Sequence, residues 1–167
     1  MQDNIIVKPS VEKQFDRFLR QGRVLFFSAP CGFGKTAVAE ALLSSREVLR
    51  LSADSAGFKL PSAEADWQIL LLDDLQDMQE EQDWNALCEL IRACPERRFV
   101  LLSRGTPPGS LMAFQYTGLM TVLEADDLLF DADDVRRLFQ LSGANVTDSE
   151  IDGILKESVG YPLGVAI

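Results

Sequence analysis

A short apolar run that leads directly into a glycine-rich loop constrains this chain more than any other feature. Residues 23–28 read RVLFFS, residues 29–36 read APCGFGKT, and TAVAEALLSSR begins at Thr36. A continuous apolar run is typical of a strand buried on both faces, and the segment after the loop has helix formers at helical spacing. This order predicts a strand, a tight loop and a helix, as in a parallel α/β sheet.

The loop follows the phosphate-binding pattern G-x-x-x-x-G-K-[ST], with Ala29 in place of the first glycine. Such a loop holds phosphates with backbone N–H groups backed by the positive end of a helix. We expect Lys35 to reach the β and γ oxygens of a nucleotide and to take part in catalysis, and Thr36 to complete the shell of Mg²⁺. A chance GKT between a strand and a helix is the alternative. The residues expected to bind the nucleotide are Cys31, Gly32, Phe33, Gly34, Lys35, Thr36 and Ala37.

Two acids end a later apolar run, WQILLLDD, at residues 67–74. A carboxylate at the end of a buried strand can hold Mg²⁺ through water, and a second acid beside it can orient an attacking water. We therefore assign Asp73 to the metal and Asp74 to catalysis. Taken alone, adjacent aspartates after a strand more often cap a turn or a helix. Arg104, which ends the run RRFVLLSR, is either a catalytic cation that senses a γ-phosphate or a solvated strand end.

Apolar runs and helix-like segments alternate as far as residue 125. Further strands are predicted at residues 47–53, 97–104 and 118–125, and an amphipathic helix at residues 80–96 with Asp83 as its N-cap. Strands that alternate with helices predict an α/β fold with a parallel sheet.

From residue 126 the pattern changes to helical segments separated by Gly, Asn and Thr-Asp caps. Helices are predicted at residues 131–143, 147–158 and 160–167. The last of these is apolar and stops without a helix-ending signal, as if the chain continued. The expected domains are a nucleotide-binding core, residues 1–125, and a truncated helical subdomain, residues 126–167.

Charge and cysteine content narrow the class of protein. The 16 Lys and Arg residues against 26 Asp and Glu residues give a net charge of −10, which argues against nucleic-acid binding by this segment. The 3 cysteines form no CxxC pair and histidine is absent, so no zinc site is expected and a reducing cytoplasm fits best. No apolar run reaches the roughly 20 residues that a membrane span needs.

Five segments resemble, in this order, the ATPase domain of the MalT/LuxR-type signal-transduction ATPases of the STAND class. They read SAPCGFGKT, LLLDDLQ, LLSRGTPP, ADDLLFDADDVRRLF and SVGYPLGVAI. The family's loop commonly starts with Ala or Ser, so Ala29 fits this resemblance. The implied fold is a P-loop NTPase with a five-stranded, mainly parallel sheet in the order 5-1-4-3-2, followed by the helical subdomain.

The resemblance also implies site residues. Pro162, in the family's G-x-P element, would pack on the adenine, and Val7, in the stretch that the family has as R-P, would line the nucleotide pocket. Lys8 replaces the arginine of that stretch and lacks its planar fork, which argues against direct phosphate or base contact there. Arg104 would be the sensor arginine. Gln76 stands where the family usually has His, which weakens a proton-transfer role, and residues 54–66 replace a long helical segment.

The leading functional hypothesis is a regulatory ATPase module that uses ATP or ADP and Mg²⁺. In the family, ADP holds the core and the helical subdomain together, ATP exchange opens them for self-association or contact with other domains, and slow hydrolysis resets the switch. One alternative is a small-molecule kinase, although beyond Arg104 the only arginine cluster is Arg136-Arg137. Another is a nucleotide-binding interaction module without hydrolysis, because Asp74 is only a candidate.

Overall fold

A single parallel β-sheet forms the centre of the molecule in the computed structural model, which describes residues 5–160 and 162. Its strand order is β2-β3-β4-β1-β5, and every pairing is parallel. The expected order 5-1-4-3-2 is the same order read from the other edge, so that prediction is confirmed. The strands are β1 (Val24–Ser28), β2 (Leu49–Ser52), β3 (Ile69–Asp73), β4 (Arg98–Ser103) and β5 (Met120–Glu124).

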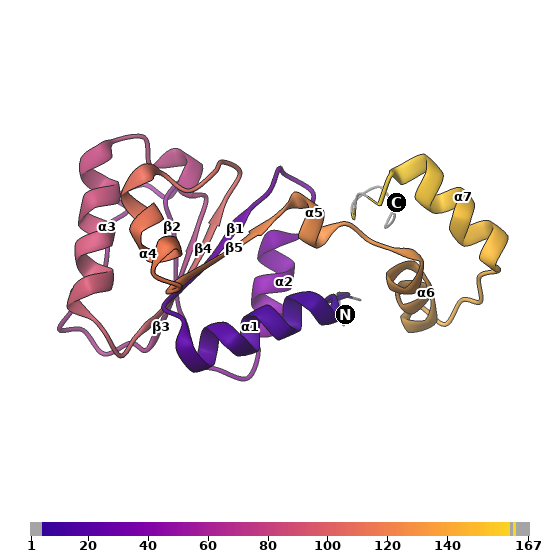
Figure 1. Cartoon of the computed structure of the whole chain (residues 1–167), viewed down its shortest axis with the longest axis horizontal. Coiled ribbons are helices and arrows are strands. Elements are labelled where there is room, and N and C mark those ends of the chain that lie inside the picture. Colours follow the sequence, from indigo (N-terminus) through magenta and orange to yellow (C-terminus); the bar gives the residue numbers. More distant parts are fainter. Residues whose placement is uncertain (1–4, 161, 163–167) are drawn as a thin grey trace.

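Helices cover both faces of the sheet and give three layers (Figure 1). One face packs against α1 (Pro9–Gln21) and α2 (Lys35–Leu42), and the other against α3 (Glu81–Ala93) and α4 (Met112–Tyr116). Short 3-10 turns, η1 (Leu75–Asp77) and η2 (Gly109–Leu111), follow β3 and precede α4. Because both faces are covered, the central strands are continuous apolar runs, and residues 24–27 are fully buried.

Helices α1, α2 and α3 differ from the sequence predictions. Helix α1 was not foreseen, although Val11, Phe15 and Phe18 lie on one buried stripe. Helix α2 ends at Leu42, earlier than the predicted segment. The expectation that Asp83 is an N-cap was wrong, because α3 begins at Glu81 and Asp83 already lies in its first turn. An acid there favours the helix through the dipole rather than as its cap.

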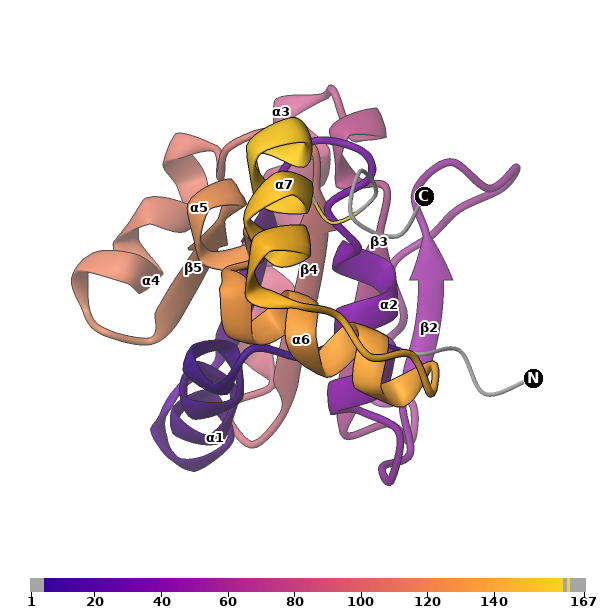
Figure 2. The same cartoon turned by 90° about the vertical axis from the view of Figure 1, so that its right-hand side faces the viewer.

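A small helical unit follows β5 (Figures 1 and 2). Its helices are α5 (Ala125–Leu128), α6 (Ala132–Leu141) and α7 (Asp148–Ser158). Helices α6 and α7 pack around Val135 and Ile151, whereas Leu128 joins the cluster formed with α1 and α2. The expected boundary at residue 126 therefore falls within α5. Of the predicted last helix, 160–167, only residues 160 and 162 are described.

An ion pair joins α6 to the segment that precedes α1. Lys8 Nζ lies 2.8 Å from Asp134 Oδ2 and donates to the carbonyl oxygen of Leu129 at 2.5 Å. The two side chains are 16% and 3% exposed, for Lys8 and Asp134 respectively. Asp134 Oδ2 also accepts the N–H of Asp131 as part of the capping box that starts α6. Residues far apart in the sequence thus fix the helical unit beside the α/β layers.

We expect Asp134→Ala to lower the free energy of unfolding by about 3 kcal/mol, because removing one partner leaves a mostly buried ammonium without its close carboxylate. Urea unfolding followed by circular dichroism measures this loss. A double variant, Lys8→Met with Asp134→Leu, should recover a large part of it, because neither charge is then left unpaired.

The matched control is Arg136→Met on the same helix. Arg136 pairs with Asp133 and Asp148, whose side chains are 85% and 89% exposed. We expect its loss to cost less than about 1 kcal/mol, as is usual for surface pairs. Equal losses for Asp134→Ala and Arg136→Met would contradict a special role for the buried pair.

Candidate nucleotide-binding site

The loop between β1 and α2 curls through two glycines in the left-handed region. Gly32 has φ 87° and Gly34 has φ 74°, and Gly34 is the N-cap residue of α2. A side chain at either position would strain the backbone. Ala29 does not belong to the positive-φ residues and is 1% exposed in the core. Its conformation needs no glycine, which explains the one departure from the phosphate-binding pattern.

Lys35 opens α2 and turns its side chain back over the loop. Its Nζ donates to the carbonyl oxygens of Ala29 at 2.6 Å and Pro30 at 3.0 Å. Desolvation lowers the pKa of Lys35, while the nearby Cys31 and Asp73 oppose that shift. The ammonium is therefore held at the mouth of the loop, among acceptors that phosphate oxygens can replace.

The two residues assigned to a metal lie together. Thr36 Oγ1 donates to Asp73 Oδ2 at 2.8 Å, which joins the first turn of α2 to the end of β3. The described part of the chain has no cluster of three or more His, Cys, Asp or Glu side chains suited to a metal. A hydroxyl and one carboxylate nevertheless suit Mg²⁺, which takes its remaining ligands from waters and substrate phosphates.

Asp74 is held in an unusual conformation beside this pair. Its φ is 56°, and its N–H donates to Asp73 Oδ1 at 2.7 Å. Both carboxylate oxygens accept hydrogen bonds: Oδ2 from Ser52 Oγ at 2.8 Å and Oδ1 from Gln76 Nε2 at 3.2 Å. A non-glycine residue in this region needs support from its surroundings and is common at functional sites. The carboxylate of Asp74 therefore has a defined orientation.

A cavity of about 320 Å³ lies among these groups. It brings together all the residues predicted to bind metal or to act in catalysis, Arg104 included. The assignment of Ser52 and Gln76 as partners of Asp74 was missed by sequence reasoning, although Ser52 ends β2 at the same edge of the sheet. The lining residues are Cys31, Gly32, Gly34, Lys35, Thr36, Ala37, Asp73, Asp74, Gln76 and Arg104.

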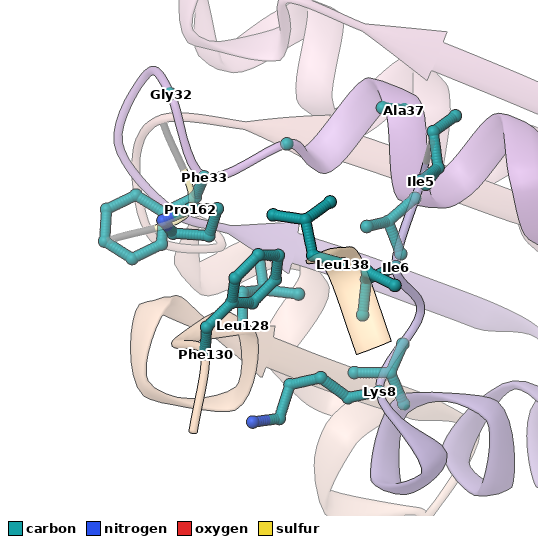
Figure 3. Close-up of a pocket in the computed structure, with 13 residues that line it drawn as sticks. Ile5, Ile6, Lys8, Gly32, Phe33, Ala37, Leu128, Phe130, Leu138 and Pro162 are labelled. Atoms are coloured by element: carbon teal, nitrogen blue, oxygen red, sulfur yellow. The ribbon is translucent and has the colours of Figure 1, made fainter. Parts of the chain in front are cut away.

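A second cavity of about 270 Å³, mainly apolar, shares Gly32, Gly34 and Ala37 with the first. Figure 3 shows Phe33, Pro162 and Phe130 on one side and Ile5 and Ile6 on the other. The lining residues come from the N-terminal segment, the loop and the helical unit. They are Ile5, Ile6, Lys8, Val11, Gly32, Phe33, Gly34, Ala37, Val38, Leu128, Phe130, Leu138 and Pro162.

Backbone geometry holds Phe130 and the residues near Pro162 together at this cavity. Phe130 N–H donates to the carbonyl oxygen of Gly160 at 2.8 Å. Gly160 has φ 76°, and a Cβ there would lie 2.7 Å from the carbonyl oxygen of Phe130. Only glycine fits such a close approach of two backbones. The glycine of the G-x-P element thus brings α7 against the segment between α5 and α6.

The residues predicted to bind the nucleotide outside the charged cavity do not all lie at the apolar cavity. Pro162 and Phe33 line the apolar cavity, but Val7 lines neither cavity. The carbonyl oxygen of Val7 instead accepts a hydrogen bond from Arg137 Nη1 at 3.3 Å. Its neighbours Ile5, Ile6 and Lys8 line the apolar cavity. A signal in the sequence existed only for Ile6 and Lys8, through their place in the stretch 6–9 that the family has as R-P.

Comparisons with known proteins give structural likeness only. No family model and no curated protein sequence matches this chain. A solved RuvB structure from Thermotoga maritima superposes with a TM-score of 0.62 at 16% identity, covering 96% of this chain and 59% of that one. The Walker-type ATPase PABY2304 of Pyrococcus abyssi gives 0.64 at 13% identity, covering 98% and 67%.

A third similar structure is a STAND protein with a tetratricopeptide repeat sensor, PH0952 from Pyrococcus horikoshii. Its TM-score is 0.63 at 11% identity, and the match covers 99% of this chain and 30% of that one. The chain thus spans only part of each of these longer proteins. Within the described residues, no helix has both the length and the apolarity that crossing a membrane requires. The sheet order, the loop and these likenesses show that the chain has the P-loop NTPase fold.

Proposed function

We propose that this chain is the ATP- and ADP-binding switch module of a signal-transduction ATPase. The observation that carries the proposal is the pair of adjoining cavities, one charged and one apolar, that share the glycines of the loop. A nucleotide has the same division, with charged phosphates and a flat, apolar base. Its phosphates would lie against Lys35 and the start of α2, and its base among Phe130, Leu138 and Pro162.

The charged cavity has the groups that slow hydrolysis requires. Backbone N–H groups of the loop and Lys35 would bind the phosphates, and Thr36 and Asp73 would hold Mg²⁺, which would supply positive charge to the phosphates. Asp74 orients the attacking water and accepts its proton, and Arg104 approaches the terminal phosphate from the end of β4. The two cations of the charged cavity are Lys35, at the start of α2, and Arg104, at the end of β4. A small-molecule kinase would need, in addition, a pocket for the molecule that accepts the phosphate.

The walls of the apolar cavity support a role as a switch. Ile5 and Ile6 precede the α/β layers, whereas Leu138 belongs to α6 and Pro162 follows α7. A ligand shifts a conformational equilibrium only by its differential affinity for the two states. A base bound between these walls would favour the arrangement in which the helical unit lies against the core, and nucleotide exchange would release it.

The wider context that we propose is a cytoplasmic transcriptional regulator of the MalT/LuxR type. The order of the five resembling segments and the structural likeness to a STAND protein support this class. Self-association, or contact with other domains of a longer chain, would then be the output of the switch. The charge of −10 speaks against direct nucleic-acid binding by these residues.

Lys35→Ala tests the phosphate site. We expect the affinity for ADP to fall about 10- to 100-fold, the usual value of a hydrogen bond to a charged group. Isothermal calorimetry measures it, with Lys13→Ala, an exposed lysine on α1, as the control. Unchanged ADP affinity after Lys35→Ala would refute the phosphate-loop assignment.

Asp74→Asn tests hydrolysis separately from binding. The amide cannot accept the proton of the attacking water, so we expect the turnover of ATP to fall at least about 100-fold. The affinity for ADP should stay within about threefold, because the loss concerns the transition state. Phosphate release by the purified chain measures the first quantity and calorimetry the second. Equal turnover in both proteins would remove Asp74 from catalysis.

Phe130→Ala tests the apolar cavity as a base site. Loss of an aromatic contact with a base costs about 1–3 kcal/mol, so ADP should bind roughly 5- to 150-fold more weakly. Inorganic tripolyphosphate has no base, and its affinity should stay unchanged. A parallel loss for both ligands would show that the change disturbs the loop instead of a base site.

A further inference from the structure

Gln76 forms hydrogen bonds with two other residues that line the charged cavity, Asp74 and Arg104. It belongs to η1, the turn after β3, and it lines the cavity. Its Nε2 donates to Asp74 Oδ1 at 3.2 Å, and its Oε1 accepts the backbone N–H of Arg104 at 3.1 Å. One side chain therefore joins the acid at the end of β3 to the arginine at the end of β4.

Only a group with one donor and one acceptor can make this bridge. The carboxylate of Asp74 accepts hydrogen bonds and the N–H of Arg104 donates one. A flipped amide would place donor against donor and oxygen against carboxylate, so the two partners determine its orientation. Glutamate would present two acceptors and repel Asp74, and methionine would make neither bond. A neutral imidazole, in contrast, also has one donor and one acceptor.

The side chain of Gln76 links the carboxylate of Asp74 to the backbone of Arg104. Asp74 sits in the left-handed region, and its carboxylate is fixed between Ser52 on one side and Gln76 on the other. The side chain of Arg104 is exposed, so its position depends on the backbone from which it starts. Gln76 holds that backbone directly. A displacement of Arg104 toward a terminal phosphate therefore changes a hydrogen bond to the same amide that orients Asp74.

We propose that Gln76 is a positioning residue that couples Arg104 to Asp74, so that contact with the γ-phosphate sets the orientation of the water-activating acid. The inference rests on the proposed function and adds the means by which the site distinguishes ATP from ADP. In this proposal Gln76 acts through its hydrogen bonds to Asp74 and to the backbone of Arg104. Its loss should weaken turnover and the preference for a terminal phosphate, and should leave ADP binding as it is.

The test compares Gln76→Met and Gln76→His with Gln79→Met, a matched change at an exposed glutamine three residues away. We expect Gln76→Met to lower kcat for ATP at least about 10-fold, because it removes one hydrogen bond to a carboxylate and one from a backbone N–H. The affinity for a non-hydrolysable ATP analogue relative to ADP should fall by a similar factor, with the Kd for ADP changed by less than about twofold. Gln76→His should restore both quantities, and Gln79→Met should change neither.

The outcomes separate this inference from the proposal on which it rests. A wild-type chain that binds no nucleotide refutes the proposed function itself. Suppose that the wild-type chain binds ADP and that Gln76→Met has the same kcat and the same ratio of affinities for the ATP analogue and for ADP. The coupling is then refuted, while the proposed function stands. If the wild-type chain binds but does not hydrolyse, the affinity ratio decides. Equal losses of affinity for the ATP analogue and for ADP in Gln76→Met would refute the coupling, because they would indicate a collapsed site. A lowered thermal midpoint of Gln76→Met, with no recovery of turnover in Gln76→His, would refute it for the same reason.

Discussion

Parallel pairing of β1, β3 and β4 is the constraint on which the site depends. The register sets Ser28 level with Ser103, and Ser52 level with Asp73. Strands that run in the same direction end at the same edge of the sheet, so the loops that leave neighbouring strands meet there. The phosphate loop, the paired acids and Arg104 all lie at such strand ends. These residues are far apart along the chain, and the parallel sheet brings them together.

The Lys8–Asp134 pair adds the second half of the architecture. Burying two charges costs solvation, and a well-packed apolar pair would often be at least as stable. The pair also fixes the position of α6, because Asp134 completes the capping box at the start of that helix and Lys8 donates to the carbonyl oxygen of Leu129. The apolar cavity lies beside it, with Lys8 in its wall. An ammonium so engaged offers little to a ligand, which leaves this cavity suited to a flat apolar group.

The sequence predicted the parts of the site that have a local pattern. The loop, the strand order and the acids Asp73 and Asp74 can be inferred from short motifs and from apolar runs. The hydrogen bonds of Ser52 and Gln76 depend on side chains brought together from different strand ends, and no local pattern encodes such a meeting. Helix α1 does have a local pattern, because Val11, Phe15 and Phe18 form a regular apolar stripe. The walls of the apolar cavity come from segments far apart along the chain, and no local pattern shows that Ile5 and Ile6, and not Val7, line this space.

Electrostatics explain how an acidic chain can bind a polyphosphate. Among the described residues that line the charged cavity, the cations Lys35 and Arg104 are balanced by the anions Asp73 and Asp74. Side-chain charge alone therefore supplies little net attraction. For the proposed nucleotide, the remaining attraction would come from the N–H groups of the loop, from the dipole of α2, and from a divalent cation held at Thr36 and Asp73. A cation held by Thr36 and Asp73 would offset the carboxylate charge near the phosphates, so phosphate binding and metal binding would strengthen each other and neither is expected to be strong alone.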